Sequence, residues 1–153
     1  MKDFSDFEAA LSIKNVTFSY KTGKNLPESQ ATIENLSLDV EKGSFTTLLG
    51  PSGWGKTTLL RLISGFLEPA SGQIGLFGAN QKGIAPDKSK IGMVFQDYAL
   101  FPHMTVRQNI QFGLKIKKDR DFQKKTADIA ATLDLSYLLD RYPNELSGGQ
   151  QQR

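Results

Sequence analysis

The chain has 153 residues, the size of about one domain, and a net charge of +3 from 19 basic and 16 acidic residues. Hydrophobic residues make up 39% and charged residues 23%, which argues against a wholly disordered chain. The lack of cysteine excludes disulfides and thiolate metal sites. No apolar run approaches the roughly 18 residues of a membrane span, and the acidic N-terminus lacks the apolar core of a secretory signal.

Two strands are expected in the first part of the chain. Apolar residues alternate with polar ones at two sets of positions: Val16, Phe18 and Tyr20, and Leu36, Leu38 and Val40. A period of two suits half-buried strands, and segment 21–30 holds a glycine and a proline, which predicts a loop between antiparallel partners. Segment 45–49 is apolar with little alternation, so it predicts a third strand in the middle of a layered α/β sheet.

A helix is expected over 57–64, because the segment is rich in leucine and isoleucine and Gly65 supplies a C-terminal stop. Short strands are predicted around Ile74 and Leu76 and over 91–95. From about Val106 the period becomes helical, and several residues fall on one helix face: Phe122, Thr126, Ile129, Ala130, Leu133 and Tyr137. The change near residue 96 predicts two parts, 1–96 with β and then α/β structure and 97–153 with helices.

A glycine-rich loop stands between the expected strand 45–49 and the expected helix 57–64. It fits the pattern G-x-x-x-x-G-K-[ST] without a mismatch: Gly50, Pro51, Ser52, Gly53, Trp54, Gly55, Lys56 and Thr57. Glycines let the backbone wrap around a phosphate, and backbone N–H groups at the positive end of a helix bind anions. The alternative is a glycine-rich turn that caps an ordinary helix, but the flanking strand and helix favour a nucleoside triphosphate site.

The side chains of this loop suit different parts of a triphosphate. Lys56 is expected to reach the β- and γ-phosphates, and the Thr57 hydroxyl to ligate Mg²⁺. Thr58 adds a hydroxyl near the α-phosphate. Trp54 is a large aromatic at a position that the motif leaves free, and its ring is expected to point outward, because the loop binds through its backbone.

A second glycine motif begins 90 residues after Lys56 (146 − 56) and reads Leu146, Ser147, Gly148, Gly149 and Gln150. Ser147 is a good N-cap, and Gln150 stands three residues later, as in a capping box. The two glycines leave backbone N–H groups bare at the start of a helix, which predicts a second anion site. A flexible turn is the alternative for this motif taken alone.

The two motifs together, with Gln151, Gln152 and Arg153 after the second and segment 142–145 before it, resemble the ATP-binding subunits of ABC transporters. The resemblance runs from about Leu11 to Arg153. It implies an α/β fold, a P-loop NTPase (RecA-like) core with an N-terminal antiparallel β subdomain in 1–96 and a helical subdomain in 97–153. It also implies a head-to-tail homodimer, in which the second motif binds the γ-phosphate of an ATP held by the phosphate loop of the other subunit.

The resemblance implies roles for two further residues. Tyr20 is similar to the aromatic residue that stacks on adenine, and its alternative is a core position of the β face. Gln96 matches the glutamine that contacts Mg²⁺ and the attacking water, in a loop that reports to the membrane subunits; a solvent-facing strand end is its alternative. Segment 95–106 is similar to importer ATPases that move ferric iron, polyamines or sulfate, and ferric iron is the solute we expect.

Hydrolysis needs groups that the resemblance places after the second motif, namely a strand ending in an Asp-Glu pair and a switch histidine. The chain stops at Arg153, so we expect the C-terminal part of the core to be absent and this portion to bind nucleotide without hydrolysing it. The single histidine, His103, precedes the motif and suits a packing or coupling surface. Truncation also predicts exposed apolar sheet edges.

The predicted function is therefore an ATP-binding subunit of an importer, at the cytoplasmic face of the membrane with permease partners. A soluble ABC-type ATPase of DNA repair or chromosome maintenance is the alternative, but many of those carry a long coiled coil between the two motifs, for which 90 residues leave no room. A small-molecule kinase would leave the second motif unexplained. A basic run is expected to be a solvated helix face and not a nucleic-acid site: Lys115, Lys117, Lys118, Arg120, Lys124 and Lys125.

Overall fold

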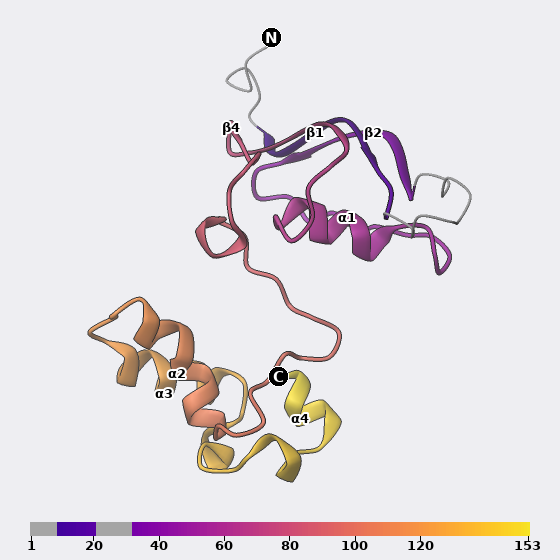
Figure 1. Cartoon of the computed structure of the whole chain (residues 1–153). Helices are drawn as coiled ribbons and strands as arrows, with labels where there is room; N and C mark the ends of the chain where they lie inside the picture. The colour runs from indigo at the N-terminus through magenta and orange to yellow at the C-terminus, as the bar shows by residue number, and fades with distance from the viewer. Residues whose placement is uncertain (1–8, 21–31) are drawn as a thin grey trace. The chain divides into compact units, whose positions relative to one another are not determined.

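The structure is a computed structural model that describes residues 9–20 and 32–153. The chain divides into two compact units, Met1–Met93 and Val94–Arg153, which are drawn in Figure 1. The first unit is a sheet with one helix, and the second is built of helices and turns. The loop predicted over 21–30 lies outside the described residues.

The sheet of the first unit has four strands, β1 (Ala9–Phe18), β2 (Ile33–Glu41), β3 (Ser71–Leu76) and β4 (Ala79–Asn80), in the order β2-β1-β3-β4. Each neighbouring pair is antiparallel. Ile13 in the central strand stands opposite Leu38 of β2 and Ile74 of β3. The antiparallel pair predicted from the alternating residues is confirmed, and so is the short strand around Ile74 and Leu76.

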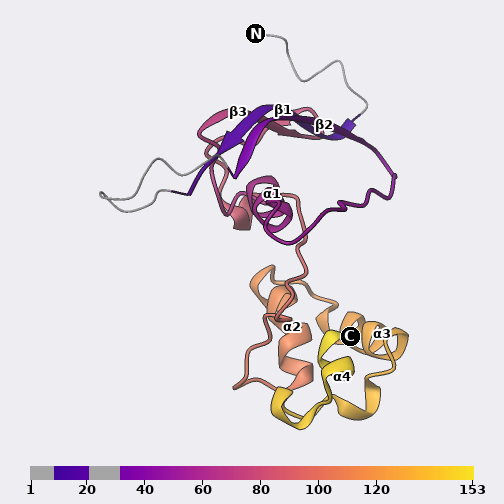
Figure 2. The ribbon, with the colours of Figure 1, turned by 90° about the vertical axis from the view of Figure 1, so that its right-hand side faces the viewer.

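Helix α1 (Lys56–Ile63) covers one face of this sheet, as Figures 1 and 2 show. The buried cluster between them draws residues from three strands and the helix: Ile13, Val16, Phe18, Ile33, Leu59, Leu62 and Ile74. Burying a side chain of this size contributes about 1.5–3 kcal/mol. The helix ends as predicted, because Gly65 has a φ of +78° and its N–H donates to Leu62 O over 3.2 Å.

Two predicted strands, 45–49 and 91–95, are wrong in this structure. Neither segment belongs to a strand, and some of their apolar side chains lie in solvent, with Phe45 96% and Val94 90% exposed. Leu48, in contrast, is half-buried against the core of the first unit. An apolar strand of the predicted kind is stable only with partners on both edges and cover on both faces. The described residues form one antiparallel sheet, and its order offers these segments no such position.

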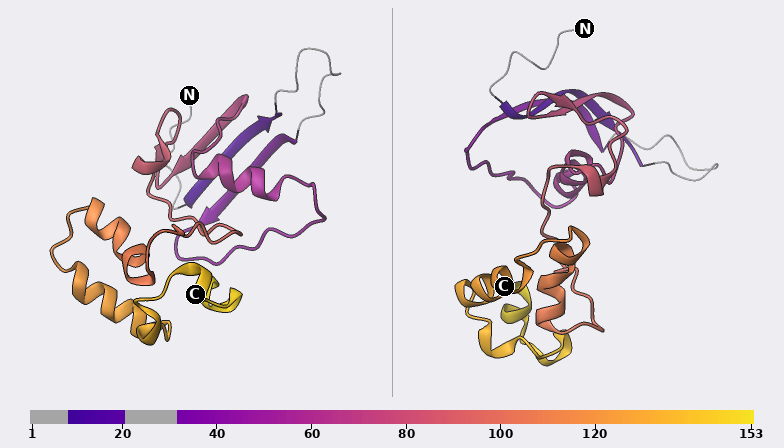
Figure 3. Two further views of the ribbon diagram at one scale, coloured as in Figure 1. Left: turned by 60° about the horizontal axis from the view of Figure 1, so that its bottom comes forward. Right: turned by 90° about the vertical axis from the view of Figure 1, so that its left-hand side faces the viewer.

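The second unit holds α2 (Val106–Ile116), α3 (Phe122–Thr132) and α4 (Gly148–Gln152), with single turns at Ser136–Leu138 and Pro143–Glu145. A further single turn, Pro86–Lys88, belongs to the first unit. Ala130, Leu135 and Leu138 form the core of the second unit, and Figure 3 shows the helices from two sides. Among the described residues, no helix is both long enough and apolar enough to cross a membrane.

The single apolar face predicted from Phe122 to Tyr137 is only partly correct. Thr126 and Ala130 are buried on α3, whereas Ile129 and Tyr137 are exposed. The helix ends at Thr132, and Asp134 follows with a φ of +54°. This left-handed residue turns the chain, so that the residues after it no longer follow the helical period.

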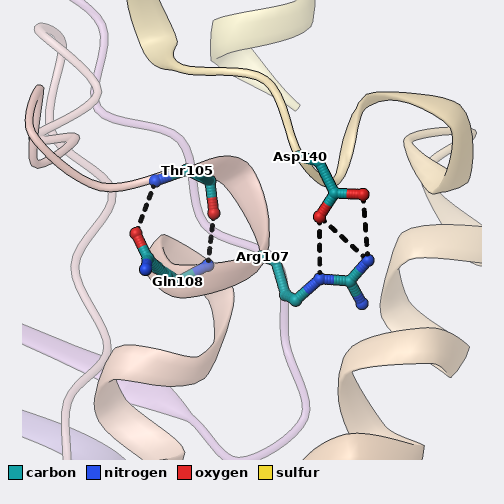
Figure 4. A network of polar contacts seen from close by, with 4 residues as sticks. All are labelled: Thr105, Arg107, Gln108 and Asp140. Atoms are coloured by element: carbon teal, nitrogen blue, oxygen red, sulfur yellow. Dashed lines mark hydrogen bonds and ion pairs between the residues drawn. The ribbon is translucent and has the colours of Figure 1, made fainter.

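The start of α2 is fixed by side chains, as Figure 4 shows. The Thr105 hydroxyl accepts from Gln108 N over 3.3 Å, and the Gln108 side chain accepts from Thr105 N over 2.9 Å, which is a complete capping box. The Arg107 guanidinium forms two hydrogen bonds to the Asp140 carboxylate, and Arg107 N donates to Leu139 O over 2.8 Å. These contacts satisfy N–H groups that a helix start leaves without partners and join α2 to the segment before Arg141.

Candidate nucleotide-binding site

The glycine loop occupies the position predicted for it, directly before α1. Gly53 has a φ of +88° and Gly55 a φ of +77°, values that residues with a side chain rarely adopt. A Cβ at Gly55 would also lie 2.9 Å from Thr32 O and 3.2 Å from Ile33 Cγ1. Position 55 therefore requires glycine for two reasons: the backbone has a positive φ, and the chain that enters β2 leaves no room for a Cβ.

Lys56 folds back across this loop. Its ammonium group donates to Gly50 O and to Pro51 O, each over 2.7 Å. The only positive charge of the loop is thus held at the backbone that would surround a phosphate. The two carbonyl acceptors are neutral, whereas phosphate oxygens carry negative charge that attracts the ammonium group, so phosphate oxygens would compete well for these N–H groups.

The two threonines that follow Lys56 differ in exposure. Thr57 is exposed, whereas Thr58 is buried, with 7% of its surface accessible. The Thr57 hydroxyl is open to a ligand beside Lys56, which fits the role predicted for it toward Mg²⁺. The described residues contain no cluster of three or more acidic, histidine or cysteine side chains. A hard cation here would take its other ligands from phosphate oxygens and water, as Mg²⁺ commonly does.

Tyr20 lies beside the first turn of α1. Its hydroxyl is 3.1 Å from Thr58 Oγ1, and its ring meets Phe18 edge-on, with centroids 5.0 Å apart. The side chain is 43% exposed, which is too much for the core position that was its alternative. The structure brings Tyr20, Lys56, Thr57 and Thr58 together, and the contact of Tyr20 with adenine stays a prediction.

Trp54 stands at the outside of the loop. It is 72% exposed, and a Cβ at Gly50 would lie 3.4 Å from its Cε3 atom. The ring therefore packs against the first glycine of the loop. It also lines a pocket with Leu48, Leu49 and Leu36.

The second motif forms the predicted capping box in the second unit. Ser147 Oγ accepts from Gln150 N over 3.3 Å, and Gln150 Oε1 accepts from Ser147 N over 2.8 Å. Gly148 and Gly149 begin α4, and a Cβ at either would meet nothing within 4 Å. The Gln151 amide donates to Pro143 O over 2.7 Å and anchors the helix to the preceding turn. The helix start is open around both glycines, and its binding of a phosphate stays a prediction.

Gln96 is exposed in a turn of the second unit. The turn closes through Tyr98 N, which donates to Phe95 O over 3.1 Å, and both Tyr98 and Ala99 have a positive φ, of +60° and +48°. Two successive left-handed residues that are not glycine are costly. The structure places Gln96 and the second motif in one unit and the phosphate loop in the other, and the role of Gln96 stays a prediction.

Two other features of the second unit have packing contacts. His103 meets the Phe101 ring edge-on at 6.0 Å, and Phe101 packs on Phe112 at 4.5 Å. In the basic run, Lys125 pairs with Asp119 over 2.5 Å, which lowers the pKa of that carboxyl below its ordinary value. The ammonium of Lys115 lies 5.5 Å from the centre of the Phe122 ring.

Sequence reasoning missed one polar residue of the second unit, Asn109. Its amide donates to the carbonyls of Phe101, Met104 and Thr105 and accepts from Phe101 N. The available signal was an asparagine in the first turns of a helix that begins at a threonine cap. Such a side chain commonly bonds to nearby backbone groups.

A protein family described as "ABC transporter" matches residues 33–153, which is most of the chain. The chain belongs to the ABC transporter family. Both glycine motifs lie within the matched region. The fold is that of an ABC ATPase cassette, with the P-loop NTPase core and the antiparallel β strands predicted from the sequence.

Named relatives in this family are import ATP-binding proteins. The spermidine/putrescine import ATP-binding protein PotA of Nitrosospira multiformis is 48% identical over 147 residues, covering 95% of this chain and 39% of the relative. The trehalose import ATP-binding protein SugC of Mycobacterium tuberculosis is 47% identical over 132 residues, covering 85% and 34%. The xylose/arabinose protein XacJ of Haloferax volcanii is 49% identical over 126 residues, covering 79% and 32%. The chain thus spans about two fifths or less of the length of these relatives.

Solved structures give the same family. A dimeric structure of the ATP-binding cassette MJ0796 in a post-hydrolysis state, bound to ADP and Pi, matches with a TM-score of 0.80 and 30% sequence identity. The match covers 92% of this chain and 65% of that one. An ATP-binding cassette of similar fold has therefore been observed as a dimer bound to ADP and Pi.

Proposed function

We propose that this chain is the ATP-binding portion of an ABC importer subunit, and that in the whole protein ATP binding and hydrolysis drive solute uptake. The observation that carries the proposal is the phosphate loop, where Lys56 Nζ lies 2.7 Å from two loop carbonyls and the exposed Thr57 follows it. The relatives named above are import ATP-binding proteins, which supports the same activity.

The loop residues divide the work of binding. Backbone N–H groups of Gly53 to Thr57 and the N-terminus of α1 surround the phosphates. Lys56 exchanges its two carbonyl acceptors for phosphate oxygens, and Thr57 holds the Mg²⁺ that accompanies ATP. That ion supplies positive charge to the phosphate oxygens. The exposed Tyr20 ring lies beside α1, where it stacks on adenine.

The second motif serves a second copy of the chain. Ser147, Gly148, Gly149 and Gln150 bind the γ-phosphate of an ATP in the partner's loop, which makes the subunit a head-to-tail homodimer. The open start of α4 around its two glycines supports this role, and so does the dimeric cassette among the solved structures. In the assembled dimer, Gln96 orients the water molecule that attacks the γ-phosphate of ATP.

The membrane partners are permease subunits, which the subunit meets at the cytoplasmic face. Segment 95–106 supports this assignment, because its sequence is similar to importer ATPases and its side chains Phe101 and His103 are exposed. Polyamines are the solutes we propose, since the PotA relative covers 95% of the chain. A sugar is the second candidate, from the SugC and XacJ relatives. Ferric iron, expected from the sequence, finds no support in these relatives.

Nucleotide binding tests the central proposal. Calorimetric titration with MgATP should show binding that Lys56→Ala weakens at least about tenfold, because a charge-assisted contact is lost. Lys42→Ala removes an exposed lysine in the turn after β2, away from the phosphate loop in sequence, and should leave the affinity unchanged. Equal affinity of the two variants would overturn the proposal.

Uptake tests the solute. The whole subunit, expressed with its permease partners, should support uptake of labelled spermidine that Lys56→Ala abolishes. Uptake of a labelled pentose or disaccharide instead of spermidine would replace the polyamine by a sugar.

A further inference from the structure

Basic side chains are concentrated where α2 is joined to α3. Segment 115–125 holds 6 of the 19 basic and 2 of the 16 acidic residues, a net charge of +4, and the remaining residues, with 13 basic and 14 acidic, carry −1. Figures 1 and 3 show the turn between α2 and α3 at the end of the second unit away from α4. The six exposed cations form the α2–α3 basic patch: Lys115, Lys117, Lys118, Arg120, Lys124 and Lys125.

The stability of the helices does not account for this distribution. Lys115 in the last turn of α2 is favourable, because the C-terminus of a helix is the negative end of its dipole. The start of α3 is a positive end, yet its first turn holds Lys124 and Lys125 and no acidic residue. The N-cap residue, Asp121, forms no side-chain capping hydrogen bond. Cations at this helix start oppose the dipole, so they point to a partner outside the fold.

The turn holds the patch in a defined arrangement. Lys118 N donates to Lys115 O and Asp119 N donates to Leu114 O, each over 3.0 Å. The Asp119 carboxylate pairs with Lys125 and so ties the start of α3 to the turn. In the part of the chain that the structure describes, no ion pair is formed by the other cations around the turn: Lys117, Lys118, Arg120 and Lys124. These four charges are open to an anionic partner.

Exposed apolar side chains adjoin the patch. Ile116, the last residue of α2, is 66% exposed, and Phe112, one turn earlier, is 37% exposed. Both line a groove with Lys115, His103 and Met104, and the last two belong to the segment proposed to face the permease. Cations beside exposed apolar side chains are typical of surfaces that bind the membrane interface. The apolar contact and the position beside the permease segment both favour a lipid surface.

The aromatic residue of segment 115–125 does not suit a nucleic acid. Single strands bind on aromatic rings that are free to stack with bases. Phe122 is half-buried, and the ammonium of Lys115 lies 5.5 Å from the centre of its ring. The ring already has a cation beside it, so the patch has charge for a nucleic acid but no open stacking platform.

We propose that the α2–α3 basic patch binds the anionic phospholipid headgroups of the membrane surface, and that Ile116 enters the headgroup layer beside them. The inference rests on the proposed function, because it takes the subunit to work at the face of a membrane. Each lysine or arginine near an anionic bilayer strengthens binding by about fivefold. Several cations together are therefore needed for attachment, and the turn supplies them in one place.

The experiment measures flotation of the full chain with lipid vesicles on a density gradient, which separates bound protein from aggregates. One set of vesicles is phosphatidylcholine alone, and the other has equal parts of phosphatidylcholine and the anionic phosphatidylglycerol. The patch variant removes three cations that have no ion pair: Lys117→Gln, Lys118→Gln and Lys124→Gln. The matched control removes the same charge from exposed positions of the first unit: Lys42→Gln, Lys82→Gln and Lys88→Gln. Thermal unfolding checks that each variant is folded.

The wild type should bind the anionic vesicles at least about tenfold more tightly than the neutral ones. Binding should weaken between about 0.05 M and about 0.5 M salt, because salt screens the charges. The patch variant should weaken binding to anionic vesicles at least about tenfold, and the control variant by less than about twofold. Ile116→Asn should weaken it about threefold and keep the salt dependence, because an apolar contact is lost.

Several outcomes contradict the inference. Equal binding of the wild type to both kinds of vesicle would show that apolar surface and not the patch mediates attachment. Equal loss in the two triple variants would mean that only the net charge matters. Tighter binding to a DNA or RNA oligonucleotide than to anionic vesicles would make the patch a nucleic-acid site. A wild-type chain that binds MgATP but no vesicles overturns the inference alone, whereas one that binds vesicles but no MgATP overturns the proposed function.

Discussion

The side chain of Asn109 pairs with both backbone polar groups of Phe101. Phe101 N donates to Asn109 Oδ1 over 2.9 Å, and Asn109 Nδ2 donates to Phe101 O over 3.2 Å. The same Nδ2 lies 3.1 Å from Met104 O and 3.0 Å from Thr105 O. One amide in the first turns of α2 thus holds Phe101, Met104 and Thr105, which belong to segment 95–106, the segment proposed to face the permease.

Asn109→Ala should loosen this segment, because four backbone contacts lose their partner. We expect a loss of about 1–3 kcal/mol in the free energy of unfolding and faster amide exchange at Phe101. Asn109→Asp keeps the acceptor for Phe101 N but turns a carboxylate toward three carbonyls. It should retain protection at Phe101 while losing comparable stability. Unchanged exchange at Phe101 in Asn109→Ala would show that the pairing is dispensable.

Features set by neighbouring residues were the predictable part of this fold. The alternation in β1 and β2, the helix after the glycine loop, its stop at Gly65 and the capping box at Ser147 all follow from a few consecutive residues, and all are confirmed. Each depends on the geometry of a few consecutive residues, such as side-chain periodicity or a helix cap, and not on distant contacts.

Features set by distant partners were not predictable. Segments 45–49 and 91–95 have strand-like sequences, but a strand exists only where another strand pairs with it, and local sequence does not contain that information. Likewise, the bond between Tyr20 and Thr58 joins residues 38 apart. Asn109 was missed although its partners lie close by in the sequence, because they are backbone groups whose positions depend on the path of the chain and not on residue type.

Gly55→Ala should damage the phosphate loop more than Gly53→Ala does. Both positions have a positive φ, so alanine at either costs about 1–2 kcal/mol. Only at Gly55 does the new Cβ also meet Thr32 O at 2.9 Å, while nothing lies within 4 Å at Gly53. Chemical denaturation should rank wild type above Gly53→Ala and Gly53→Ala above Gly55→Ala. Equal stability of the two variants would mean that β2 shifts freely to make room.

The turn before the second motif should lose stability in acid. The Glu145 carboxylate accepts from Tyr142 N over 2.6 Å and from Arg141 over 3.1 Å, which holds the pKa of this carboxyl below its ordinary value. A carboxyl whose pKa is lowered by folding stabilises the folded state at pH values above its unfolded pKa of about 4.3. That contribution is lost as the pH falls through the folded pKa. The wild type should therefore be more stable than Glu145→Gln at neutral pH, with the difference shrinking below about pH 5.

Asp128→Asn is the control for this titration, because Asp128 is an exposed carboxylate on α3. Unfolding of the three proteins between about pH 3 and pH 7 checks the expectation. A difference between wild type and Glu145→Gln that stays constant across this range would show that the hydrogen bonds do not depend on the charge.

Ser147→Ala should release the start of α4, because the hydroxyl that accepts from Gln150 N is removed. Loss of such a cap costs about 0.5–2 kcal/mol, and in a helix of five residues it should appear as faster amide exchange at Gln150. Ser147→Asp separates the fold from the ligand: its carboxylate caps the helix and preserves protection at Gln150, yet repels a phosphate at the same N-terminus. If the Gln150 amide loses its protection from exchange in both variants, the serine has a structural role besides capping. If the amide stays protected in both variants, the Gln150 side chain alone holds the helix start.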